Sequence, residues 1–208
     1  PEVEGVSAPV IERYLPSRDY EKHNRELKRA RRFLKQRSQK TWFEIRLSAV
    51  MDPFLEEARE LSEEWKKIET AEGNSGGENS LCFCHGDFQY HNILRQDRGF
   101  FLVNFEKCQA DGPVRDLYLL LRKLLEKCEW DSSWGKDLLA AYESVRPLRP
   151  YERQDLFYRL SYPEKLWKIV NFYYNSGKSW IPEKNQEKLD RLLEQEAARK
   201  NFLKTLWK

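Results

Sequence analysis

The sequence predicts an α+β fold that is predominantly α-helical. Two observations carry this prediction. Apolar residues recur at helical spacing over most of the chain, and one short region, about residues 81–106, has the residue types and turn signals of strands and a hairpin. The chain has 208 residues, 40% of them hydrophobic and 13% aromatic, so its composition builds a core and excludes a disordered chain.

The first part of the chain is predicted to contain a loop and two helices. Residues 1–19 show little periodicity and indicate a loop, whereas residues 20–38 predict a basic helix. The pair Asp52-Pro53 predicts a helix start, with Asp52 as the N-cap. An apolar stripe from Phe54 to Ile68 then continues this helix up to a polar, glycine-rich loop.

The middle of the chain is predicted to hold the strands, and helices follow. Residues 81–84 predict a short buried strand with Cys82 and Cys84 on one side, and residues 92–95 and 100–105 predict a hairpin. The segment from Pro113 to Cys128 is rich in leucine, which predicts a largely buried helix. Further amphipathic helices are expected over 133–146, 151–160, 162–176 and 183–207.

The predicted β region carries the polar residues of greatest chemical interest. Its loop reads His85-Gly86-Asp87-Phe88-Gln89-Tyr90-His91-Asn92, and Asn104-Phe105-Glu106 follows the hairpin. Phosphoryl transfer needs a carboxylate that orients or deprotonates the attacking hydroxyl and oxygen ligands that hold Mg²⁺ on the nucleotide. If the second hairpin strand continues far enough, a period of two places Asn104 and Glu106 on one face.

These motifs resemble the aminoglycoside phosphotransferase and choline kinase superfamily. There the catalytic loop reads roughly H-G-D-x-x-x-x-N and the metal strand reads I-D-F-E. The resemblance implies a protein-kinase-like fold, of which residues 20–208 match the helical C-terminal lobe and residues 1–19 a remnant of the inter-lobe connection. Segments near residues 20–27, 163–168 and 178–182 look like the spore-coat CotS branch, which implies spore-coat proteins as partners and the spore coat as a location.

The resemblance also implies cofactors and roles. It implies ATP and Mg²⁺ as cofactors and a small hydroxyl-bearing acceptor. The implied roles are Asp87 as catalytic base, Asn92, Asn104 and Glu106 as metal ligands, and His85 and Asp116 as loop scaffold. Candidates for the acceptor pocket are Glu164, Tyr173 and Trp180. Alone, this lobe is expected to be inactive, because the nucleotide is normally clamped between two lobes.

Asn104 departs from the family pattern, which has Asp at this position. The change removes one negative charge from the ligand set of a cation that favours anionic oxygens. Three interpretations remain open: a weak enzyme that relies on Glu106, a pseudokinase that binds a nucleotide or a partner, and an inactivated form of a competent enzyme.

Charge and cysteine content restrict the other classes. The net charge is only +3, so neither nucleic acid nor a membrane surface is an expected partner, and the basic stretch 28–37 is interpreted as a solvated helix face. No apolar run approaches the ~18 residues of a membrane span. Four irregularly spaced cysteines indicate reduced thiols and a cytoplasmic location. A zinc site from Cys82, Cys84, His85 and Cys108 is the less favoured alternative, because the spacing fits no common pattern.

Overall fold

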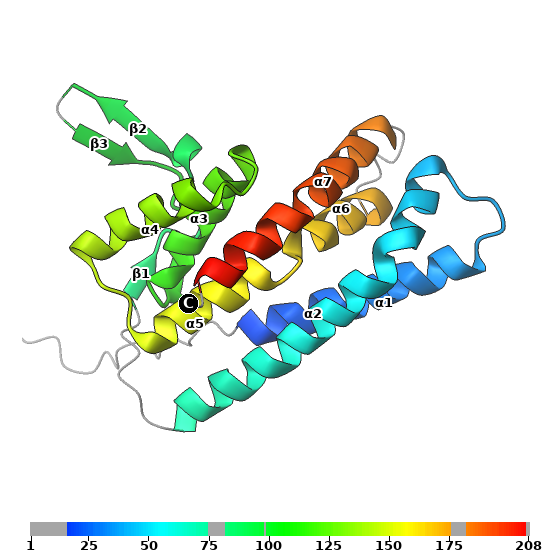
Figure 1. The fold of residues 1–208 in the computed structure, drawn as a ribbon, viewed down its shortest axis with the longest axis horizontal. Helices are drawn as coiled ribbons and strands as arrows, with labels where there is room; N and C mark the ends of the chain where they lie inside the picture. The colour runs from blue at the N-terminus through cyan, green and yellow to red at the C-terminus, as the bar shows by residue number, and fades with distance from the viewer. Residues whose placement is uncertain (1–15, 75–81, 98, 176–181, 207–208) are drawn as a thin grey trace, which may run out of the picture.

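The computed structural model describes residues 16–74, 82–97, 99–175 and 182–206. Over these residues the fold is α+β and predominantly helical, as predicted (Figure 1). The helices are α1 (Pro16–Gln36), α2 (Trp42–Asn74), α3 (Val114–Lys127), α4 (Ser132–Val145), α5 (Pro150–Ser161), α6 (Glu164–Asn175) and α7 (Pro182–Leu206). The strands are β1 (Cys82–Cys84), β2 (Ile93–Gln96), β3 (Gly99–Leu102) and β4 (Gln109–Asp111), with one short 3₁₀ helix, η1 (Tyr90–Asn92), before β2.

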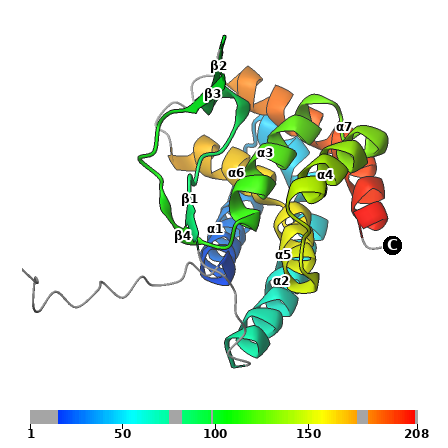
Figure 2. The ribbon, with the colours of Figure 1, turned by 90° about the vertical axis from the view of Figure 1, so that its left-hand side faces the viewer.

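The strands form two small antiparallel ladders. β2 pairs with β3 in the predicted hairpin, which projects from the helical body (Figure 1). β1 pairs with β4, so that Cys82 lies opposite Asp111 and Cys84 opposite Gln109. β4 was not predicted, and β1 is less buried than expected, since Cys82 is exposed and only Cys84 is fully buried. The predicted catalytic loop belongs to the segment that leaves β1 and returns to the chain's next pairing partner, β4 (Figure 2).

The predicted helix start at Asp52-Pro53 is wrong. Helix α2 begins at Trp42, eleven residues before Pro53, and runs through this proline, which cannot donate the usual backbone hydrogen bond. Buried side chains on both sides of the proline, among them Leu47 and Met51 before it and Ala58 after it, pack into the core. Asp52 is not an N-cap but forms an ion pair with Arg31 of α1. Tertiary packing therefore overrides the local start signal.

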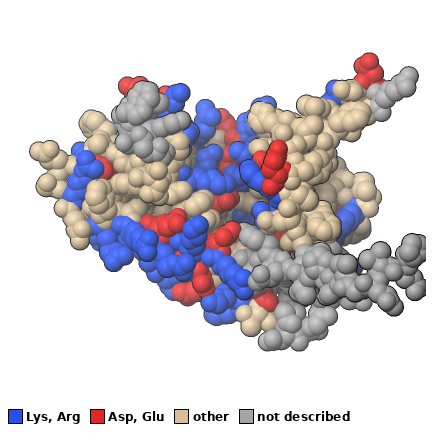
Figure 3. All heavy atoms as spheres, turned by 180° about the vertical axis from the view of Figure 1, so that it is seen from behind, with Lys and Arg blue, Asp and Glu red and all other residues tan. Residues whose placement is uncertain are grey.

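Helix α7 joins two hydrophobic cores. Leu189, near its start, packs with residues of α1, α2 and α6, whereas Phe202 and Leu203, near its end, pack with residues of α3, α4 and α5. All three side chains are buried. The basic helix α1 contributes its inner face to the first core and leaves most of its cations in solvent, where acidic side chains lie among them (Figure 3).

Candidate functional site

A carboxylate at the start of α3 binds the backbone of the loop after β1. Asp116 accepts hydrogen bonds from the backbone N–H groups of His85 (2.6 Å) and Gly86 (2.9 Å). Gly86 has φ +74°, and a Cβ built on it would lie 2.0 Å from the carbonyl oxygen of Lys107. Only glycine fits there without moving the backbone, since it tolerates positive φ and has no side chain.

His85 uses both ring nitrogens to hold the chain. Its Nδ1 accepts the backbone N–H of Asp87 at 3.2 Å, so its Nε2 carries the proton and donates to the carbonyl of Val103 at 2.8 Å. The side chain is 4% exposed. With neither nitrogen free, His85 links the loop to the segment after β3 and has no site from which to move a proton to a ligand.

The carboxylate of Asp87 faces the surface but is already engaged. One oxygen accepts Gln89 Nε2 at 3.0 Å and the other accepts Lys107 Nζ at 2.9 Å. Lys107 is exposed, so this pair is an ordinary surface ion pair worth no more than about 1 kcal/mol. Each carboxylate oxygen can accept a second hydrogen bond, and the side chain is 30% exposed, so Asp87 keeps acceptor sites for a ligand hydroxyl.

Asn92 and Asn104 bind each other through their side-chain amides. Asn92, 5% exposed, donates its Nδ2 to the backbone carbonyl of Asp87 at 2.8 Å. Its remaining Oδ1 accepts Asn104 Nδ2 at 2.9 Å. The oxygen that the family resemblance assigns to the metal is therefore pointed at an N–H donor.

Asn104 and Glu106 lie beyond the strand that was predicted to carry them. β3 ends at Leu102, and Asn104 has φ +67°. A residue in the left-handed region breaks an extended run, so the period-two argument does not apply to Asn104 and Glu106. Both side chains are exposed.

This arrangement does not fit Mg²⁺. The oxygens of Asn92 and Asn104 do not converge, because an N–H lies between them, and Glu106 is the single anion of the set. Mg²⁺ demands near-octahedral oxygen coordination and gains most from carboxylates. Over the described residues, no group of three His, Cys, Asp or Glu is placed to hold a metal ion, so the alternative zinc site finds no support there.

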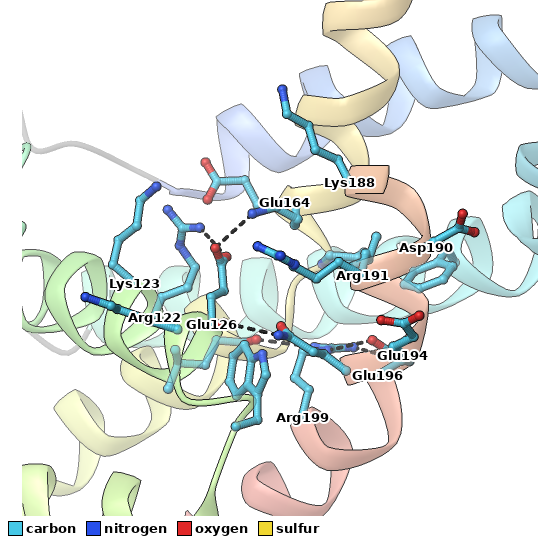
Figure 4. A pocket seen from close by; sticks show the side chains of 18 of the residues that line it. Arg122, Lys123, Glu126, Glu164, Lys188, Asp190, Arg191, Glu194, Glu196 and Arg199 are labelled. Atoms are coloured by element: carbon cyan, nitrogen blue, oxygen red, sulfur yellow. Dashed lines mark hydrogen bonds and ion pairs between the residues drawn. The ribbon is translucent and has the colours of Figure 1, made fainter. Parts of the chain in front are cut away.

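Two of the three candidates for an acceptor pocket, Glu164 and Tyr173, lie in different parts of the structure. Glu164 lines a cavity of about 810 Å³ between α3, α6 and α7 (Figure 4). Tyr173 is instead packed in the first core, with its hydroxyl 3.1 Å from that of Thr41, and is not part of the cavity lining. Trp180 lies outside the described residues.

Glu164 is a half-buried carboxylate with two partners. It accepts the hydroxyl of Tyr118 at 2.6 Å and pairs with Lys168 at 2.9 Å. Burial by itself would raise its pKa, but Lys168 and Arg122, with the bond from Tyr118, lower the pKa of Glu164 to about 2. Glu164 is thus an anion at neutral pH.

Two residues of these sites were missed in the sequence. Lys107, the partner of Asp87, directly follows the Asn104-Phe105-Glu106 motif. Arg122 lines the cavity from α3 and is buried. A charged residue inside a leucine-rich, buried helix was the signal that pointed to it, because buried arginines are almost always partnered.

Comparisons with known proteins agree with this fold. Residues 67–206 match the model of a family described as spore coat putative kinase YutH. Spore coat protein S of Bacillus subtilis (strain 168) is 33% identical over 126 residues, which are 60% of this chain and 36% of that protein. The chain thus spans about a third of the length of this curated relative.

Solved structures include two relatives of low sequence identity. An aminoglycoside phosphotransferase from Alicyclobacillus acidocaldarius superposes with a TM-score of 0.78 at 20% identity, over 93% of this chain and 57% of that one. A choline/ethanolamine kinase family protein from Mesorhizobium loti reaches a TM-score of only 0.40 at 16% identity, over 88% of this chain and 70% of that one. The first of these supports the kinase-like fold. Over the described residues, every helix is too short or too polar to cross a bilayer.

Proposed function

The chain belongs to the spore coat putative kinase YutH family, and from this premise we propose that it is the helical lobe of a kinase-like coat protein that does not transfer phosphate. Its role would be to bind partners in the spore coat, as the name of its relative spore coat protein S suggests. The fold and loop of a phosphotransferase would serve as a scaffold.

One observation carries this proposal. Asn104 Nδ2 donates a 2.9 Å hydrogen bond to Asn92 Oδ1. These are the two side chains that would have to bind Mg²⁺ together, and they bind each other instead. Both amides are neutral, and one donates to the other, so this contact needs no cation. A carboxylate at position 104 would face the oxygen of Asn92 and repel it unless a cation lay between them.

The second candidate is an active phosphotransferase that uses ATP and a small hydroxyl-bearing acceptor. The complete loop frame favours it, because Asp116 and His85 still hold the backbone around Asp87. In that case Asp87 would orient the acceptor hydroxyl, and the Asn104 amide would have to turn its oxygen towards Asn92.

Calorimetric titration of ATP into the full-length protein, with and without Mg²⁺, separates the two candidates. The test compares the natural protein with Asn104→Asp, and Asn201→Asp serves as the control, since it adds the same charge at an exposed position of α7. We expect Mg²⁺ to leave ATP binding unchanged in the natural protein and in the control, and to strengthen it in Asn104→Asp. Mg²⁺-dependent ATP binding by the natural protein would instead favour the enzyme.

A further inference from the structure

The cavity between α3, α6 and α7 has an excess of positive charge. Eight Lys or Arg and six Asp or Glu side chains line it. Three of the carboxylates also pair with cations that do not line the cavity, in the pairs Glu164–Lys168, Asp190–Arg46 and Glu196–Lys200. Within the lining, Glu126 pairs with Arg122 and Lys165, and Glu196 also pairs with Arg199, so these two carboxylates engage three of the eight cations.

Arg122 lies at the inner wall of this cavity with a donor unused. Its Nη1 donates to Glu126 at 2.7 Å, but its buried Nε has no acceptor within the described part of the chain. The side chain is 9% exposed. A buried N–H without a partner is uncommon, and an acceptor supplied by a ligand would complete it.

Two further cations face Arg122 from either side. Lys123 comes from α3, and Arg191 reaches in from α7 towards Glu126 (Figure 4). Neither forms an ion pair with any carboxylate in the residue ranges that the structure describes. Burial, and after it the charge of the neighbouring Arg122, lowers the pKa of Lys123.

We propose that this cavity binds a small molecule that carries a phosphate group. A phosphate monoester has a charge of about −1.5 to −2 at neutral pH and three strong acceptor oxygens. Three converging cations, two of them arginines, suit such a group, because the guanidinium fork matches phosphate oxygens. A volume of about 810 Å³ far exceeds a phosphate ion and is within the ~300–1,000 Å³ of small-molecule sites.

The cavity also reaches the loop described above. Tyr90 of η1 is part of its lining, and Lys127 at the end of α3 lies over the Tyr90 ring at 5.0 Å. The cavity therefore adjoins the segment that contains Asp87 and Asn92, although neither of these two residues lines it. The proposal does not depend on whether the protein transfers phosphate.

Isothermal titration in EDTA, without added metal, tests this site in the full-length protein. The probes are glycerol 3-phosphate, inorganic phosphate and glycerol, and the variants are Arg191→Gln and Lys123→Gln. Lys204→Gln is the control, because it removes one charge from an exposed position of α7 outside the cavity. Thermal melting establishes that each variant is folded.

We expect glycerol 3-phosphate to bind and glycerol not to bind. Each cavity variant should weaken binding about tenfold, the usual effect of one lost charge-assisted hydrogen bond, and Lys204→Gln should not. Equal binding of inorganic phosphate would assign the recognition to the phosphate group alone and support the proposal. No binding of either phosphate, or equal losses in the cavity variants and the control, would overturn it. Because Mg²⁺ and Asn104 play no part in the test, its failure leaves the proposed function unaffected.

Discussion

The substitution Glu164→Gln tests how much the charge of Glu164, in the cavity wall, contributes to the stability of the fold. The pKa of Glu164 falls from its ordinary 4.5 to about 2, and that difference corresponds to about 3 kcal/mol of stability at neutral pH. Because the side chain is 21% exposed, solvent screening reduces the expected value to about 2 kcal/mol. Glutamine keeps the size and can still accept the Tyr118 hydroxyl, so the loss isolates the charge.

The pH dependence has a definite sign. A carboxyl with a lowered pKa contributes its full stability above the unfolded-state pKa of 4.5 and loses it as the pH falls towards about 2. The natural protein should therefore be more stable than Glu164→Gln by about 2 kcal/mol at pH 7, and the two should converge near pH 2.

Urea unfolding followed by tryptophan fluorescence, over a series of pH values, measures this difference. Glu194→Gln is the matched control, because Glu194 lines the same cavity but is exposed. The reasoning is refuted if Glu164→Gln is as stable as the natural protein at pH 7, or if the difference between them grows as the pH falls.

Two further predictions concern the loop and the strand before it. Gly86→Ala should lower the free energy of unfolding by about 2–4 kcal/mol, because the new Cβ would sit on a residue with φ +74° and lie 2.0 Å from the Lys107 carbonyl oxygen. Thermal denaturation followed by circular dichroism measures the loss, and an unchanged midpoint would contradict the prediction. Iodoacetamide should modify Cys82 before Cys84, since Cys82 is exposed, whereas burial raises the pKa of Cys84; mass spectrometry of timed samples gives the order, and equal rates would contradict it.

The helices of the second half of the chain could be predicted closely from the sequence. The structure has α3 over Val114–Lys127 where 113–128 was predicted, and α7 over Pro182–Leu206 where 183–207 was predicted. Helix α3 has strong apolar periodicity, and neither helix has a conflicting local signal. The prediction failed where a local signal opposed packing, as at Pro53, and where pairing was distant, as in β4.

The residues of the candidate site could be located from the sequence, but their contacts could not. The motif placed Asp87, Asn92 and Asn104 in one region, and the structure brings them together. That Asn104 reaches Asn92 depends on the end of β3 and on a left-handed turn. Its Nδ2 faces Asn92 because the Nδ2 of Asn92 is bonded to Asp87 and its Oδ1 is left to accept. The cavity depends on α3 and α7, which are far apart in the sequence, so no local pattern could have indicated the convergence of Arg122 and Arg191.

Asn at position 104 has two possible explanations: the backbone conformation favours it, or its side-chain chemistry does. Its φ of +67° is a left-handed conformation that both Asn and Asp adopt more readily than other side chains do. The backbone therefore gives no reason to replace Asp by Asn. What the replacement changes is chemical: it exchanges an oxygen for an N–H donor, and that donor lies 2.9 Å from Asn92 Oδ1. The loop keeps its shape through a hydrogen bond between two neutral groups, where a carboxylate would require a cation.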